Sequence, residues 1–340
     1  MMNLKNSSTG LLLTGAILFL MALGCGGTQS GPKPEWTKLK KIAGKEQGLS
    51  HVSGVVVDDK FAYTTIGGTV ADANAGTNGL RKVPLDGGAV TMLDNGEKYP
   101  QAEQGGIAQD EKYVYWNSGG EIARIGKDNG KREAVATEFV GIGIDMVLDT
   151  ERVYWANHGY YSSSTPIKPS PIYSVAKSGG KAEIFVDGQM APGNIVVDEK
   201  FVYWTTPSSI MKQAKTGGTP QVVLQASDKE GIDKLEQDGG DLYFGFRGAG
   251  ESRWALRKIS KAGGEPQTIA KTFSLKQFVI DDENIYFFDE EGLSADVLCR
   301  VPKSGGEVTK LDTGYASGVM TGGKTKVFLA SLDDIYAWGK

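Results

Sequence analysis

Cysteine and histidine are scarce in this chain of 340 residues, which contains two of each. Cys25 and Cys299 stand at opposite ends of the sequence, so a framework of disulfides is excluded. His51 and His158 are far apart in sequence and have no cysteine pair beside them, which excludes a typical zinc site. The variable residue types at the positions equivalent to Cys299 indicate a bystander and not a nucleophile.

Basic runs and the common enzyme motifs are also missing. The 37 basic and 41 acidic residues are spread along the chain and give a net charge of −4, so no nucleic-acid partner is expected. There is no Walker loop, dinucleotide-binding fingerprint, nucleophile elbow or Ser-His-Asp spacing. The sequence therefore predicts no cofactor and offers no catalytic residue of these classes.

The one long apolar run lies near the start, at residues 11–23. A helix of this length spans roughly 20 Å, which is shorter than the hydrocarbon core of a bilayer and typical of a signal peptide. The junction Met21-Ala22-Leu23-Gly24-Cys25 resembles the lipobox of bacterial lipoproteins, although Ala22 stands where Leu is preferred. That resemblance implies cleavage before Cys25 and a diacylglycerol on its thiol.

The resemblance divides the chain into a signal peptide (1–24), a lipidated cysteine with a flexible tether (25–35) and a globular domain (36–340). It implies a protein of the cell envelope that is attached to a membrane through its lipid. Gly26 replaces the Asp that retains some lipoproteins in the inner membrane, so the outer membrane is favoured over the inner. A plain secretory signal with a cysteine near its cleavage site is the alternative.

A repeat fills the globular domain. A turn acid is followed five residues later by a strand tyrosine in six copies: Asp58/Tyr63, Asp110/Tyr115, Asp149/Tyr154, Asp198/Tyr203, Asp238/Tyr243 and Asp281/Tyr286. A degenerate seventh copy has Gly323 and Phe328. The spacing of about 40–50 residues is typical of four-stranded propeller blades. We expect the acids to cap their turns through Asx hydrogen bonds and not to bind calcium.

Each of the first six copies continues with a strand and a tight turn, which is a glycine pair in five of them and Asn129-Gly130 in the other. The last copy ends at the strand Ile335–Trp338, and residues 36–43 resemble its missing fourth strand. The sequence thus predicts an all-β propeller of seven four-stranded blades that is closed by the N-terminal strand, with six or eight blades as alternatives. Closure of this kind removes a free sheet edge.

Three copies place Tyr-Trp in the second strand, at Tyr115-Trp116, Tyr154-Trp155 and Tyr203-Trp204. These strands are similar to the YWTD repeats of lipoprotein-receptor-type propellers and, more loosely, to NHL-like propellers. The fourth-position Asp of that family is absent here. The resemblance therefore implies the fold and no functional residue.

One face of the predicted ring carries connections of unequal length. The segment from the strand aromatic to the glycine turn is 14 residues in copies 2 and 4 and 19–25 residues in copies 1, 3, 5 and 6. Loops on a rigid scaffold are where binding usually resides, and Tyr, Trp and Arg are enriched at binding hot spots. The predicted ligand-binding residues are His158, Tyr160, Tyr161, Phe246, Arg247 and Trp254; alternatively, the aromatic side chains pack onto their own blades.

Two functions remain open. The favoured one is a non-catalytic binding or scaffolding protein whose partner is an envelope protein, a glycan or a small ligand. The alternative is a metal-dependent hydrolase or lactonase-like enzyme with oxygen ligands from the inner strands of several blades. Its candidate ligands are Glu103, Asp145, Asn194 and Asp233.

Overall fold

The computed structural model describes residues 39–67, 79–96, 106–118, 120–137, 142–158, 169–275, 277–290, 296–315, 318–322, 326–331 and 333–339. The blades lie within the compact unit Glu35–Lys340. Cys25 and its tether lie outside the described residues. Among those described, no helix is long and apolar enough to cross a membrane.

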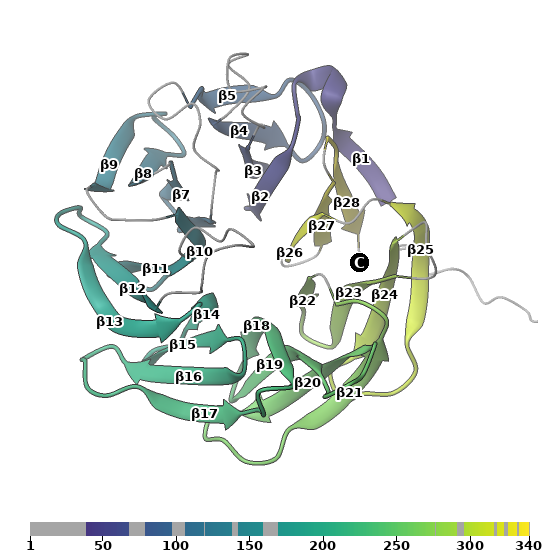
Figure 1. The fold of residues 1–340 in the computed structure, drawn as a ribbon. Helices are drawn as coiled ribbons and strands as arrows, with labels where there is room; N and C mark the ends of the chain where they lie inside the picture. Colours follow the sequence, from purple (N-terminus) through teal and green to yellow (C-terminus); the bar gives the residue numbers. More distant parts are fainter. Residues whose placement is uncertain are drawn as a thin grey trace, which may run out of the picture. The chain divides into compact units, whose positions relative to one another are not determined.

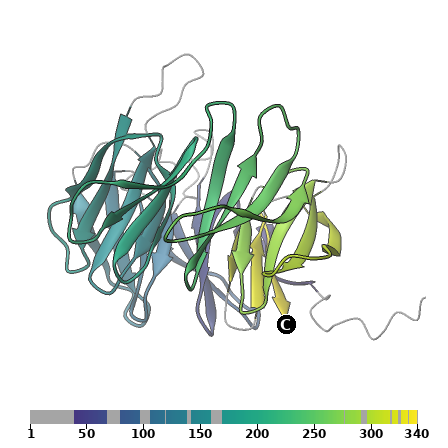
Figure 2. The same ribbon diagram turned by 90° about the horizontal axis from the view of Figure 1, so that it is seen from below.

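Seven four-stranded antiparallel sheets form a ring, which confirms the predicted fold and blade number (Figure 1). From the innermost strand outward, the first three blades are β2 (Val52–Val57), β3 (Phe61–Ile66), β4 (Gly79–Pro84), β5 (Thr91–Asp94); β6 (Ile107–Gln109), β7 (Tyr113–Asn117), β8 (Glu121–Gly126), β9 (Arg132–Thr137); and β10 (Ile142–Leu148), β11 (Arg152–His158), β12 (Pro169–Ala176), β13 (Glu183–Met190). The strands run between the two faces of the ring (Figure 2).

Blades 4 to 6 follow the same order. They consist of β14 (Gly193–Val197), β15 (Phe201–Thr206), β16 (Ser209–Ala214), β17 (Gln221–Gln225); β18 (Gly231–Asp238), β19 (Asp241–Arg247), β20 (Trp254–Ser260), β21 (Gln267–Thr272); and β22 (Phe278–Ile280), β23 (Asn284–Glu290), β24 (Asp296–Pro302), β25 (Thr309–Tyr315). The tight turns between the third and fourth strands hold their glycines at positive φ, as at Gly217 (95°) and Gly218 (114°).

Blade 7 joins the two ends of the described chain. β26 (Val319–Gly322), β27 (Lys326–Ala330) and β28 (Ile335–Gly339) are completed by β1 (Leu39–Ala43), which pairs antiparallel with β28. The predicted closure by the N-terminal strand is therefore confirmed. Because β1 covers the outer edge of β28, that strand is paired on both sides.

The Tyr-Trp pairs follow from the alternation of side chains along a strand. Tyr154 packs against the blade that follows it, in a cluster with Trp204, whereas Trp155 packs against the preceding blade, in a cluster with Tyr115. All four side chains are at most 1% exposed or nearly so. Each ring therefore joins neighbouring blades, and its burial contributes about 2–3 kcal/mol.

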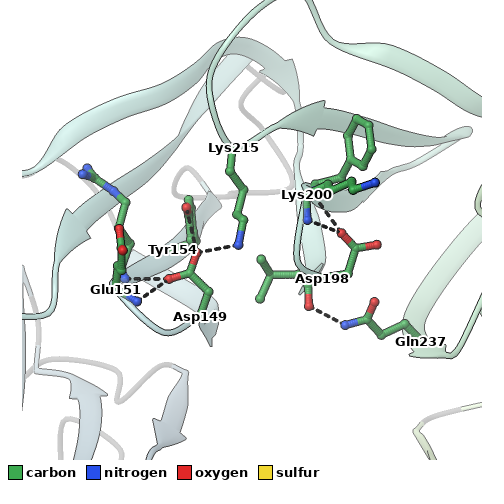
Figure 3. A network of polar contacts seen from close by, with 10 residues as sticks. Asp149, Glu151, Tyr154, Asp198, Lys200, Lys215 and Gln237 are labelled. Atoms are coloured by element: carbon green, nitrogen blue, oxygen red, sulfur yellow. Dashed lines mark hydrogen bonds and ion pairs between the residues drawn. The ribbon is translucent and has the colours of Figure 1, made fainter.

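The turn acids cap their turns as predicted. Asp149 Oδ1 accepts the backbone N–H groups of Glu151 (2.8 Å) and Arg152 (2.7 Å), while its Oδ2 accepts the Tyr154 hydroxyl (3.3 Å) and Lys215 Nζ (3.0 Å) from the next blade (Figure 3). Backbone caps of the same kind form at Asp58, Asp110, Asp198 and Asp281. Asp238 is the exception, since its turn contains Gly239 at a φ of 54° and its carboxylate pairs with Lys303.

Candidate functional site in the central channel

One inner strand departs from the repeat at the position that pairs with the strand aromatic. Six blades place a small or apolar residue there: Val56, Ala108, Val147, Val196, Val279 and Thr321. Blade 5 places Glu236 there instead, opposite Tyr243. Glu236 is half-buried, and its carboxyl has no hydrogen-bond partner among the described residues. A carboxyl in this environment is expected only where it has a task.

The inner strands of blades 3, 4 and 5 bring further polar groups to the same region. Asn194 Nδ2 donates to Asp233 Oδ1 at 2.9 Å, which links β14 to β18. Asp145 Oδ2 accepts the N–H of Ile195 at 2.7 Å, which links β10 to β14. We call Asp145, Asn194, Asp233, Lys234 and Glu236 the channel cluster.

The backbone of the channel cluster is strained. Asn194 and Lys234 have φ values of 40° and 51°, in the left-handed region that favours glycine. Both lie at β-bulges, where the strand register shifts between Gly193 and Val196 and between Asp233 and Leu235. Bulges re-aim side chains and gather next to functional sites, and strain of this kind persists only where the surrounding structure enforces it.

Burial and like charge together change the acidity of the two inner carboxyls. Burial is the main cause that raises the pKa of Glu236, to about 8, and the nearby Asp145 adds to it. Burial also raises the pKa of Asp145, although the N–H groups of Ile195 and Met146 and the charge of Lys234 act against this. At neutral pH Glu236 is therefore mostly protonated and able to donate a hydrogen bond.

Glu236 also borders a cavity of about 370 Å³ in the centre of the ring, lined by the inner strands of blades 1 to 5 and 7. Gln109 and Gln237 line it too, and their side-chain Nε2 atoms donate to the backbone carbonyls of Val57 and Val197 on neighbouring inner strands. Figure 3 shows the Gln237 contact. The Oε1 atoms of both glutamines are buried without a hydrogen-bond partner, so they are free acceptors.

These groups offer a ligand both donors and acceptors. Glu236 and Lys234 donate, whereas Asp145, Asp233 and the two glutamine oxygens accept. That mixture suits a neutral or weakly charged polyhydroxylated molecule. Within the described part of the chain, no group of three or more His, Cys, Asp or Glu side chains is arranged to hold a metal ion.

Three of the four residues predicted as metal ligands do lie together. Asp145, Asn194 and Asp233 belong to adjacent inner strands, but their printed contacts are with one another and with the backbone. Glu103 lies outside the described residues. Sequence reasoning missed Lys234, Glu236 and the two glutamines, although an alignment of the seven copies would have shown Glu236 as the one acid at an apolar position.

The predicted loop residues fall into three groups. Tyr160 and Tyr161 lie outside the described residues, and only the backbone of His158 is described, at the end of β11 opposite Ile142. Phe246 is 8% exposed and packs between blades 4 and 5, as in the alternative that placed the aromatics on their own blades. Arg247 and Trp254 pair across the ends of β19 and β20.

Comparison with known proteins supports the fold. No protein-family model and no curated protein matches the sequence. The extracellular domain of a putative one-component system from B. thetaiotaomicron is similar with a TM-score of 0.65 at 11% identity, over 89% of this chain and 40% of that chain. This chain thus spans well under half of that one.

Two oligogalacturonate lyases are similar over nearly their whole length. The Vibrio parahaemolyticus enzyme has a TM-score of 0.64 at 9% identity, over 89% of this chain and 96% of its own. A lyase in complex with manganese has a TM-score of 0.60 at 11% identity, over 89% and 97%. At these identities the likenesses show a shared fold, and the chain is a seven-bladed β-propeller.

Proposed function

We propose that this protein is a non-catalytic binding propeller of the cell envelope whose ligand enters the channel cluster. The observation that carries the proposal is Glu236: an acid without a partner stands where every other blade is small or apolar, beside a second carboxyl and a strained backbone. A site with convergent polar groups and shifted pKa values is the usual signature of ligand binding.

The proposed address rests on the lipobox-like junction at Cys25. A diacylglycerol on this cysteine attaches the propeller to a membrane, with the outer membrane favoured over the inner. The similarity to an extracellular sensor domain is compatible with this address. The YWTD/NHL-like resemblance adds only the repeat and no ligand.

Binding to oligosaccharides tests the function. The full-length lipoprotein in detergent is titrated calorimetrically with an oligogalacturonate, chosen because structural neighbours are lyases of that saccharide, and with neutral cello- and galacto-oligosaccharides. We expect at least one of them to bind, and Asp145→Asn and Glu236→Gln each to weaken it about tenfold, as loss of one buried hydrogen bond to a ligand does. Glu265→Gln, an exposed acid without a printed contact, is the matched control.

Failure to bind any of these saccharides, or equal binding by the cluster variants and the control, would contradict the proposal. The same samples are examined for products by mass spectrometry. A protonated Glu236 beside Asp145 is also an arrangement that general acid–base chemistry uses, so saccharide cleavage that depends on these two residues would favour the enzyme alternative over the binding protein.

A further inference from the structure

The loop-face rim of blade 5 gathers arginine and aromatic side chains. Gly231, Arg247, Trp254 and Thr272 are paired in one row across the four strands, from the inner strand β18 to the outer strand β21. Arg253 precedes Trp254, and Phe273 follows Thr272. We call Arg247, Arg253, Trp254 and Phe273 the blade 5 rim.

Each arginine of the rim lies over an aromatic ring. The Arg253 guanidinium is 3.9 Å from the centre of the Phe273 ring, and that of Arg247 is 5.4 Å from the Trp254 ring. Both arginines are exposed, and neither forms an ion pair with a described acidic side chain. In a chain of net charge −4, two arginines left without acid partners on one edge of a blade are a local excess of positive charge.

Phe273 is held in place and still exposed. Asp289 Oδ1 accepts the Thr272 hydroxyl (2.5 Å) and the N–H groups of Phe273 (2.7 Å) and Ser274 (3.2 Å), which ties this connection to blade 6. The Phe273 side chain is nevertheless 50% exposed. A ring presented in a fixed orientation loses little conformational entropy on binding.

The surroundings of the ring favour a sugar over a protein as the partner. The other large hydrophobic side chains that are exposed on the described chain lie on outer strands of other blades: Met92, Ile184, Met190 and Val222. Phe273 is therefore an isolated ring and not part of a contiguous apolar patch, which a protein interface needs at its core. An isolated ring suits the C–H face of a pyranose, while a guanidinium binds a carboxylate through two parallel hydrogen bonds.

We propose that the blade 5 rim binds a carboxylated oligosaccharide, with sugar rings on Phe273 and Trp254 and their carboxylates on Arg253 and Arg247. The inference rests on the proposed function and names the ligand class. The Trp254 ring reaches to within 3.9 Å of the position that a Cβ on Gly231 would occupy. Gly231 lies two residues before Asp233, so the rim leads along β18 to the channel cluster.

The test compares an oligogalacturonate with its carboxyl-reduced form on the full-length lipoprotein. We expect the acidic form to bind at least tenfold more tightly and its affinity to fall as salt is raised. Arg247→Gln and Arg253→Gln should each weaken its binding five- to tenfold, and Phe273→Ser should weaken both forms. Lys181→Gln, an exposed cation without a printed contact, is the control, and unchanged melting temperatures show that each variant is folded.

The outcomes separate this inference from the proposed function. If both forms bind equally, or if binding depends on Asp145 and Glu236 but not on the two arginines, the rim assignment is overturned and the proposed function stands. Arginine-dependent binding of poly-glutamate in place of the oligogalacturonate also overturns it, in favour of an acidic peptide. If no saccharide binds, both proposals fail.

Discussion

Glu236 shows how one residue can depart from a repeat without disturbing the fold. Its backbone keeps the register of the other inner strands, since it pairs with Tyr243 as Val196 pairs with Tyr203. Its side chain, however, exchanges an apolar contact for a carboxyl that burial keeps protonated. Such a position lowers the stability of the folded chain and is retained where the group serves binding.

The cost of Glu236 should depend on pH. Its pKa is about 8 in the folded chain and 4.5 ordinarily, so the folded state holds the extra proton between these values and stability falls as the pH rises from 4.5 to 8. Glu236→Gln should therefore stabilise the protein by about 1–3 kcal/mol at pH 8, with a smaller gain at pH 6 and none below pH 4.5. Denaturant unfolding at these pH values, with Glu265→Gln as the control, measures the effect; an equal or lower stability of the variant at pH 8 would refute it.

At the scale of elements, a charged contact joins consecutive blades. A lysine in the tight turn between the third and fourth strands reaches the turn acid of the preceding blade in five successive pairs: Lys127–Asp58, Lys177–Asp110, Lys215–Asp149, Lys261–Asp198 and Lys303–Asp238. Where the preceding blade has Gly323 in place of the acid, the equivalent lysine is replaced by Leu85, which packs against the core beside β1. Blades 7 and 1 are thus joined by apolar packing at this point.

Loss of one such contact should be measurable. Burial alone would raise the pKa of Asp149, but two backbone N–H donors and Lys215 outweigh it and hold the pKa below its ordinary value of 3.8. The contact is therefore present at neutral pH and is lost as the pH falls through that lowered pKa. Lys215→Met should cost about 1–2 kcal/mol at pH 7, because the pair is largely buried.

The matched control for this contact is Lys181→Met, an exposed lysine after the glycine turn of blade 3. Urea unfolding of both variants at pH 7 and near pH 3 gives the comparison. A loss that is the same at both pH values, or equal to that of the control, would show that the ion pair with Asp149 is not its cause.

For the whole molecule, the strand that closes the ring is also the one nearest in sequence to the proposed anchor. β1 begins at Leu39 and completes blade 7, whereas Cys25 lies 14 residues earlier. Closure by pairing β1 with β28 leaves the two ends of the propeller bound together. The chain between Cys25 and β1 is then the only covalent link from the propeller to a lipid.

The anchor predicts where the protein is found. Cys25→Ser should move it from the membrane fraction to the soluble envelope fraction and abolish labelling by a radioactive fatty acid, because the lipid supplies most of the membrane affinity. Cys299→Ala is the control, since Cys299 is 1% exposed within blade 6 and offers no site for acylation. Retention of Cys25→Ser in the membrane fraction of the native host would argue for a different mode of attachment.

The sequence by itself determined the architecture, because a propeller repeats the same local chemistry in every blade. Turn acids, strand tyrosines and glycine pairs recur at fixed offsets, and each carries its own structural reason: a capped turn, a ring between blades and a positive φ. The missing fourth strand of the last copy pointed to β1 for the same reason. Asp238 alone among the acids followed a different turn, because Gly239 and Gly240 allow a tighter one.

Only the tertiary structure decided the candidate site. Asp145, Asn194 and Glu236 are separated by about 40 residues or more along the chain, and the repeat places them on neighbouring inner strands without indicating where their side chains point. Bulges at Asn194 and Lys234 set those directions, and bulges depend on packing across strands and not on local pattern. The same holds for Phe246 and Phe273, two loop-face aromatics of one blade: packing between blades buries the first, and Asp289 of the next blade holds the second in the open.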